Sequence, residues 1–276
     1  MKYLTLIIAL LINISVLEAQ QRIKGKIINS YDHPIPYATI SVTGTNKGCY
    51  SNTDGCFELI SNKDSLAVSC IGYISEQIKI DDYNDTLYVV LQKNDIALKE
   101  VVVTSQKTKL KKVKDQGKIA CSVCASKGME IISFIPVPKG STLNNLTFYC
   151  KRTRTKRIAG LRLYTYNYKN EPEEILMTEN LVVDIAPYSN KILFDVKKLN
   201  IVVPQNGLYA GLVFMDANTA EMKKKDKTNP YVYLSSKHLT KQTYIRKYND
   251  SFKPENFPCS VNKERISNLQ CSYSYY

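Results

Sequence analysis

The sequence predicts an all-β protein built from two β-sandwich domains. Short segments that alternate apolar and polar residues recur along the chain, and turn residues separate them at short intervals. No long amphipathic helix pattern interrupts them. The charge also divides the chain: residues 20–104 hold 8 Lys and Arg against 10 Asp and Glu, whereas residues 105–276 hold 29 against 14. A chain of 276 residues is long enough for two domains with a core each.

The first element is a leader, residues 1–19. It has a basic start at Lys2, an almost wholly apolar run from Leu4 to Ile14, and a small residue, Ala19, at the expected cut. This order is typical of a secretory signal peptide. An uncleaved anchor is the alternative, but the apolar run is short for a membrane span. We therefore expect an exported protein whose mature chain has no transmembrane span.

The first predicted sandwich covers residues 20–104. About seven β-rich segments with turns between them favour a small sandwich. Asp54 and Gly55 predict a tight hairpin turn, because Asp-Gly supplies the positive φ angles that such a turn needs. Gly72 suits a bulge or kink beside Tyr73. A ligand contact at either glycine is the alternative to this structural interpretation.

Five blocks in this first half resemble the carboxypeptidase-regulatory-like family. They are Ile23–Ile27 with Pro36–Ile40, Gly44–Gly48, Thr53–Phe57, Ser69–Tyr73 and Leu98–Val103, and they occur in the family's order. The resemblance implies a transthyretin-like sandwich, often classed as carbohydrate-binding-like. It also implies export in Gram-negative bacteria that degrade glycans, and hence a periplasmic or outer-membrane location. Ser65 and Thr86, each preceded by Asp, resemble O-glycosylation acceptors of such bacteria, or they simply begin turns.

The rest of the chain predicts a linker and a second domain. Residues 105–118 are lysine-rich without an apolar period, as in a linker. Residues 119–276 predict a second, basic β-sandwich with a jelly-roll-like arrangement. Its strands are expected at Leu143–Cys150, Leu161–Tyr166, Ile192–Val196 and Leu208–Phe214, and Tyr273–Tyr276 forms a last strand or a frayed end.

The densest basic run lies in this second half. The candidate partner-binding residues are Lys151, Arg152, Arg154, Lys156 and Arg157. They suit an acidic partner, either an outer-membrane protein or an acidic surface polysaccharide or lipid. The alternative is a solvated hairpin tip. Nucleic acid is not expected as a partner, because the protein is exported.

Tyrosine is unusually frequent, with 20 Tyr and no Trp. Exposed Tyr rings stack on sugars and donate hydrogen bonds through their hydroxyls. An alternative function is therefore a soluble glycan-binding protein that uses a Tyr-rich face of the second sandwich. Tyr is also a common strand residue, so packing inside the sheets remains open.

Eight cysteines leave several possibilities open. An even count in an exported protein suggests disulfides, but eight Cys allow 105 pairings. Cys49 and Cys56 are not expected to face each other, and Cys70 suits a core position. Cys121 and Cys124 have the spacing of a redox pair, although no thioredoxin-like βαβ pattern surrounds them. Structural disulfides, buried thiols, a redox pair and a metal site all stay open.

The sequence does not predict catalysis. It has no Gly-x-Ser-x-Gly motif, no phosphate-binding glycine loop and no His-x-x-Glu pair, and its only His are His33 and His238. Glu173 and Glu174 are adjacent, so strand periodicity does not aim both at one bond. We expect no catalytic residue, cofactor or metal. The expected function is a non-catalytic interaction or accessory protein at the periplasmic or outer-membrane surface.

Overall fold

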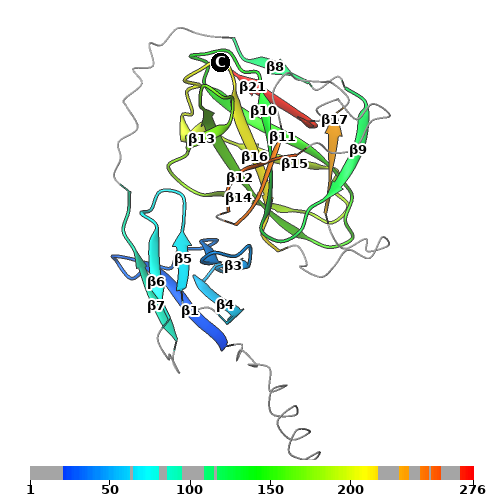
Figure 1. Ribbon diagram of the computed structural model, residues 1–276. Helices are drawn as coiled ribbons and strands as arrows, with labels where there is room; N and C mark the ends of the chain where they lie inside the picture. The colour runs from blue at the N-terminus through cyan, green and yellow to red at the C-terminus, as the bar shows by residue number, and fades with distance from the viewer. Residues whose placement is uncertain are drawn as a thin grey trace, which may run out of the picture.

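The computed structural model describes two β-domains, which lie one below the other in Figure 1. The described residues are 21–62, 65–80, 86–94, 109–114, 117–216, 230–235, 243–248, 250–255 and 268–276. The predicted leader, the block at 98–103 and His238 lie outside them. Within these residues, no helix is long and apolar enough to cross a membrane.

The first domain consists of two facing sheets, ordered β4-β1-β7 and β3-β2-β5-β6. Its strands are β1 (Gln21–Asn29), β2 (Thr39–Val42), β3 (Gly48–Tyr50), β4 (Cys56–Ser61), β5 (Ser65–Ser69), β6 (Glu76–Lys79) and β7 (Leu87–Leu91). β1 and β7 run parallel, and the other pairs are antiparallel.

Side-chain alternation builds the core of this domain. In β4, Phe57 and Leu59 are buried, while Glu58 and Ile60 between them are exposed. Ile27 from the same sheet and Ile40 from the facing sheet are fully buried in the same cluster. The period of two that predicted these strands therefore also separates the core face from the solvent face.

The predicted hairpin at Asp54 and Gly55 is wrong, although the turn itself is present. Gly55 has a φ of +75°, and its N–H donates to the Asn52 carbonyl over 3.1 Å. However, β3 before the turn pairs with β2, whereas β4 after it pairs with β1 in the other sheet. The Gly55 carbonyl accepts a hydrogen bond from the Ile27 N–H, which directs the chain to the second sheet. An Asp-Gly signal fixes the local backbone but does not choose the pairing partner.

The second domain is a larger sandwich of two seven-stranded sheets. One sheet has the order β13-β12-β16-β10-β18-β19, with β14 also paired to β12; the other has the order β20-β17-β11-β21-β8, with β15 paired to β11 and β9 to β17. The first contains β10 (Met129–Ile135), β12 (Arg157–Tyr166), β13 (Pro172–Ile175), β14 (Leu181–Ile185), β16 (Leu208–Phe214), β18 (Tyr244–Lys247) and β19 (Lys253–Pro254). The second contains β8 (Lys111–Val113), β9 (Ile119–Cys124), β11 (Leu143–Lys151), β15 (Lys191–Asp195), β17 (Tyr231–Ser235), β20 (Asn268–Leu269) and β21 (Cys271–Tyr275). A 3-10 turn, η1 (Lys197–Leu199), follows β15.

Apolar side chains from both sheets fill the space between them. Phe148 of β11 and Phe194 of β15 meet edge to face, with ring centroids 6.0 Å apart. Leu161, Leu163 and Leu212 of the opposite sheet belong to the same buried cluster. The predicted all-β class with two sandwiches is confirmed.

The predicted linker contains a strand. Lys111–Val113 form β8, which pairs with β21 at the edge of the second sandwich. Val113 also packs against the core of that domain. Edge pairing uses backbone groups, so it does not require the apolar periodicity whose absence predicted a linker.

Candidate functional site

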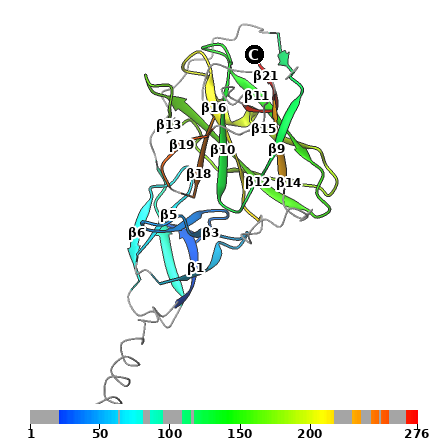
Figure 2. The same ribbon diagram turned by 45° about the vertical axis from the view of Figure 1, so that its right-hand side comes forward.

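The two domains meet at the outer face of the β13-β12-β16-β10-β18-β19 sheet; Figure 2 shows β3 and β5 below β10 and β18. The ring of Tyr50 in β3 lies against that of Tyr248 after β18, with centroids 5.7 Å apart. Asn180 Nδ2 donates to the Tyr37 carbonyl over 3.2 Å. These contacts join segments that are more than 140 residues apart in the chain.

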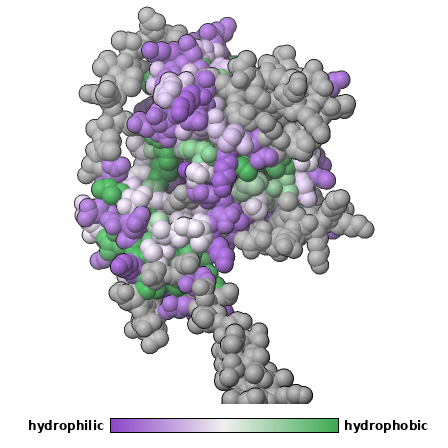
Figure 3. Space-filling view, in the orientation of Figure 1, coloured by the Kyte–Doolittle hydropathy of each residue, from purple (hydrophilic) through white to green (hydrophobic). Residues whose placement is uncertain are grey.

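A cavity of about 730 Å³ lies at this junction. The first domain contributes Tyr50, Cys70 and Tyr73 to its wall, and the second contributes Arg162 and Arg246. Figure 3 shows the surface hollowed between the upper and lower parts of the molecule, with apolar residues (green) beside the hollow. A cavity of this size at a domain interface is a usual place for a small ligand.

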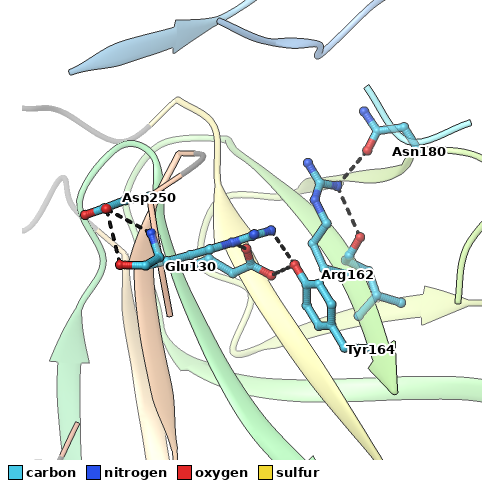
Figure 4. A network of polar contacts seen from close by, with 8 residues as sticks. Glu130, Arg162, Tyr164, Asn180 and Asp250 are labelled. Atoms are coloured by element: carbon cyan, nitrogen blue, oxygen red, sulfur yellow. Dashed lines mark hydrogen bonds and ion pairs between the residues drawn. The ribbon is translucent and has the colours of Figure 1, made fainter. Parts of the chain in front are cut away.

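Two side chains of the cavity wall, Glu130 and Arg246, form a closed polar network with Tyr164 (Figure 4). Glu130 of β10 and Arg246 of β18 stand directly opposite in the antiparallel register. Arg246 Nε donates to Glu130 Oε2 over 2.7 Å, and the Tyr164 hydroxyl donates to Glu130 Oε1 over 2.7 Å. Arg246 Nη2 donates to the Tyr164 hydroxyl oxygen, which closes the ring. Glu130 is only 4% exposed, so this pairing neutralises a carboxylate that would otherwise be buried alone.

Gly211 makes room for that carboxylate. It lies in β16, opposite Arg162 of β12 and Ile132 of β10. A Cβ at position 211 would collide with Oε1 of Glu130. The absence of a side chain in the central strand therefore lets Glu130 reach across the sheet toward Tyr164 of β12.

Arg162 lies on the same face as Tyr164, two positions earlier in β12, and it lines the cavity. It is 7% exposed. Its Nη1 donates to the Asn180 side-chain oxygen over 2.8 Å and to the Leu161 carbonyl over 3.3 Å, as Figure 4 shows. Both acceptors are neutral, and Arg162 has no carboxylate partner among the described residues. A buried cation therefore faces the cavity.

The first domain places two titratable side chains, Tyr50 and Cys70, close enough to Arg162 for its charge to affect their pKa values. Burial raises the pKa of Tyr50, and Arg162 and Arg246 partly offset that rise while Tyr248 and Glu130 add to it. Burial raises the pKa of Cys70 to about 11, against a lowering by Arg162. Both groups are therefore uncharged near neutral pH, and the junction's charge comes from the second domain.

The predicted basic run divides into three environments. Lys151, Arg152 and Arg154 are exposed, and Lys151 Nζ lies 5.6 Å from the Tyr231 ring centroid. Lys156 is exposed but forms a 2.7 Å ion pair with Asp184. Arg157 is buried in β12, with Nη1 3.8 Å from Asp216 Oδ2. The exposed, unneutralised part of the run is therefore its first half, at the β11–β12 connection.

Most tyrosines of the β12, β16 and β18 strands are buried. Tyr164, Tyr209 and Tyr244 form an aromatic cluster on the outer face of this sheet, next to Phe134 and partly covered by Phe252. Tyr209 and Tyr244 stack edge to face, with centroids 5.7 Å apart. Their role here is packing, so this face does not present a row of exposed rings.

Most cysteines of the described residues are thiols outside any disulfide. Cys121 is disulfide-bonded, whereas Cys124 is in no disulfide, so the two do not bond to each other. Cys49 and Cys56 are also free, as expected from their positions. Cys70 lies at the cavity wall as well as against the core of the first domain. Within the described residues, no group of three or more His, Cys, Asp or Glu is placed to hold a metal ion.

Sequence reasoning did not single out Glu130, Arg162 or Arg246. Each is a charged residue inside a β-rich segment, as in Leu161-Arg162-Leu163-Tyr164. A charged residue in the middle of a predicted strand is the sequence signal that could have indicated this site. In a central strand such a residue must pair with an opposite charge or face a cavity. Glu174, one of the adjacent carboxylates, lies exposed at the cavity rim in β13.

Comparison with known proteins gives a family match, over residues 23–103, to the family described as CarboxypepD_reg-like domain. No curated protein matches the chain. Among solved structures, it is similar to the cysteine protease and lectin-like domains of Cwp84, a surface layer associated protein of Clostridium difficile. That match has 11% identity and a TM-score of 0.43, and it covers 62% of this chain and 36% of that chain. A DUF3823 family protein from Bacteroides ovatus matches with 11% identity and a TM-score of 0.22, over 79% of this chain and 96% of that chain.

The family match coincides with the first domain. It begins in β1 and extends past β7, so it includes both sheets of the smaller sandwich. The family description is that of a regulatory-like domain. The resemblance predicted from the five sequence blocks is confirmed: residues 23–103 of this protein are a CarboxypepD_reg-like domain.

Proposed function

We propose that this protein is a non-catalytic binding protein that is exported, acts at the periplasmic or outer-membrane surface, and holds a small ligand between its two domains. The observation that carries the proposal is the cavity of about 730 Å³ with a buried arginine in its wall. Both domains line it, so a bound ligand contacts both and favours their closed arrangement.

The chain contains no Trp, so a single introduced Trp can report ligand binding by its fluorescence. Tyr73 lines the cavity and is partly exposed, so Tyr73→Trp places a unique fluorophore there. The matched control is Tyr168→Trp in the turn before β13, where the ring is 90% exposed.

We expect at least one of a panel of glucose, glucuronate, N-acetylglucosamine and inorganic phosphate to change the fluorescence emission of the Tyr73→Trp protein with saturation. The same ligand should leave the control emission unchanged. No response from the cavity reporter, or an equal response from both reporters, would contradict the proposal. Fractionation of the source cells tests the location separately: recovery in the cytoplasmic fraction would contradict export.

A second candidate function is docking to an acidic partner through the β11–β12 connection. The specific observation is that Lys151, Arg152 and Arg154 are exposed and have no carboxylate partner among the described residues. Such a contact should weaken with salt, because exposed charges are screened. We expect cross-linking to an outer-membrane partner in cells to be lost when all three residues are changed to Gln.

The control for docking removes three exposed cations elsewhere on the second domain, namely Lys139, Lys197 and Lys198. Equal loss of cross-links in both triple variants would indicate a general charge effect and would contradict a specific docking site. The glycan-binding alternative has less support, since the aromatic cluster of the β12 sheet is buried. The partly exposed rings that it would need lie on the other sheet, at Tyr149, Tyr231, Tyr233 and Tyr275.

A further inference from the structure

The buried and half-buried arginines of the second domain differ in how they are neutralised. Arg246 has Glu130 at 2.7 Å, and Arg157 has Asp216 at 3.8 Å. Arg162 is buried to the same degree as Arg157 but pairs only with a side-chain amide and a backbone carbonyl. Among the arginines buried in the described residues, Arg162 is therefore the one without a counter-charge.

An isolated buried charge is costly, and proteins normally pair it. Both hydrogen bonds of Arg162 use Nη1, so the Nε and Nη2 edge of the guanidinium makes no hydrogen bond within the described residues. Because Arg162 lines the cavity, that edge is available to whatever occupies it. Two parallel N–H groups on one edge match the two oxygens of a carboxylate.

The charge of the cavity wall favours a monoanion. Glu130 and Arg246 neutralise each other, which leaves Arg162 as the one interior charge without compensation among the described residues. Glu174 also lines the cavity, but at its exposed rim, where water screens it. A single carboxylate balances the interior, whereas a dianion such as phosphate leaves an excess negative charge beside Glu130.

The remaining wall suits a ligand body that is part apolar and part hydroxylated. Ile71 and Met177 are apolar, Tyr73 and Tyr248 are aromatic, and Thr178 is a hydroxyl-bearing residue of the wall. We infer that the cavity binds a small molecule with one carboxylate, and that this carboxylate pairs with the free edge of Arg162. This inference rests on the proposed function of the cavity and adds the chemical class of its ligand.

The test compares D-glucuronate with D-glucose, which has the same ring without the carboxylate, using the Tyr73→Trp reporter in the full chain. We expect glucuronate to bind at least about tenfold more tightly than glucose, as charge-assisted hydrogen bonds predict. Arg162→Gln should weaken glucuronate binding by a similar factor and leave glucose unchanged. Arg157→Gln is the matched control, since it removes an arginine of equal burial from the same strand, outside the cavity wall.

A second pair of variants separates charge from structure, because Arg162 also holds Asn180, which bonds the first domain at Tyr37. Asn180→Ala and Asn180→Asp both lose the donor to Tyr37. Only Asn180→Asp places a carboxylate where the amide oxygen now lies 2.8 Å from Arg162. We expect Asn180→Ala to keep most of the preference for glucuronate and Asn180→Asp to lose it.

The outcomes are distinguishable. Equal binding of glucuronate and glucose, tighter binding of inorganic phosphate, or full glucuronate affinity in Arg162→Gln would overturn the carboxylate inference while the cavity remains a binding site. Loss of the preference in Asn180→Ala as well as in Asn180→Asp would assign Arg162 a purely structural role and would also overturn it. Binding of no probe at the cavity would overturn the proposed function and the inference together.

Discussion

Gly211 leaves the space in which the buried Glu130 pairs with Arg246 and Tyr164. Its position in β16 is where Glu130 crosses from β10 toward Tyr164 of β12. We expect Gly211→Ala to displace the carboxylate and destabilise the protein by about 3 kcal/mol, the usual cost of breaking a buried ion pair. Urea unfolding followed by circular dichroism measures this change.

The control for Gly211→Ala is Glu130→Gln, which breaks the same ion pair without adding a side chain. Because both changes act on one network, the double variant should cost little more than the costlier single variant. Additive costs, or a Gly211→Ala protein as stable as the wild type, would show that the glycine does not serve Glu130.

Within single elements, local sequence patterns predict strands well. The expected strands at Leu143–Cys150 and Leu208–Phe214 correspond to β11 and β16. β11 shows the period of two that a half-buried strand leaves in its residues, whereas β16 is a short apolar run in which every residue is buried. The Asp54-Gly55 turn was also predicted, but its crossing between sheets was not. Pairing partners lie far along the chain, and β8 pairs with a strand that is about 160 residues away.

The candidate site could not be predicted for the same reason. Glu130, Arg162 and Arg246 come from three strands that are joined only by the sheet order β12-β16-β10-β18. Nothing local in the sequence indicates that Glu130 faces Arg246 while Arg162 faces no carboxylate. Register decides both, and register depends on the fold of the whole sheet.

At the junction, Gly72 of the first domain lies directly against the backbone of the second domain. It has a φ of +84°, and a Cβ there would collide with the Thr178 carbonyl of the other domain. Gly44 has a φ of +72° and open space around it. We expect Gly44→Ala to cost about 1 kcal/mol of strain, and Gly72→Ala to add a separation of the domains that increases the radius of gyration in X-ray scattering. An unchanged radius in Gly72→Ala would contradict a close junction at this position.

The whole molecule carries many buried phenols, and these make its stability depend on alkaline pH. Burial raises the pKa of Tyr273 to about 12, and burial also raises the pKa of Tyr50, Tyr164, Tyr209 and Tyr248. In the unfolded chain a Tyr loses its proton near pH 10. Between about pH 10 and about pH 12 the folded state therefore binds more protons than the unfolded state, so the free energy of unfolding falls as pH rises.

Each such Tyr should remove about 1.4 kcal/mol per pH unit inside this window, and the contribution is fully present below pH 10. We expect the urea midpoint to begin to fall at about pH 8.5, because burial also raises the pKa values of the Cys49, Cys70 and Cys150 thiols, and to fall more steeply above about pH 10, where the tyrosines add to the effect. Tyr273→Phe should lower the steepness of that fall, although it also removes the hydrogen bond of the Tyr273 hydroxyl to the Pro136 carbonyl. Tyr168→Phe, at a ring that is 90% exposed, is the control. A midpoint that stays flat across the whole range would mean that these tyrosines are accessible to water in the folded protein, and would contradict the prediction.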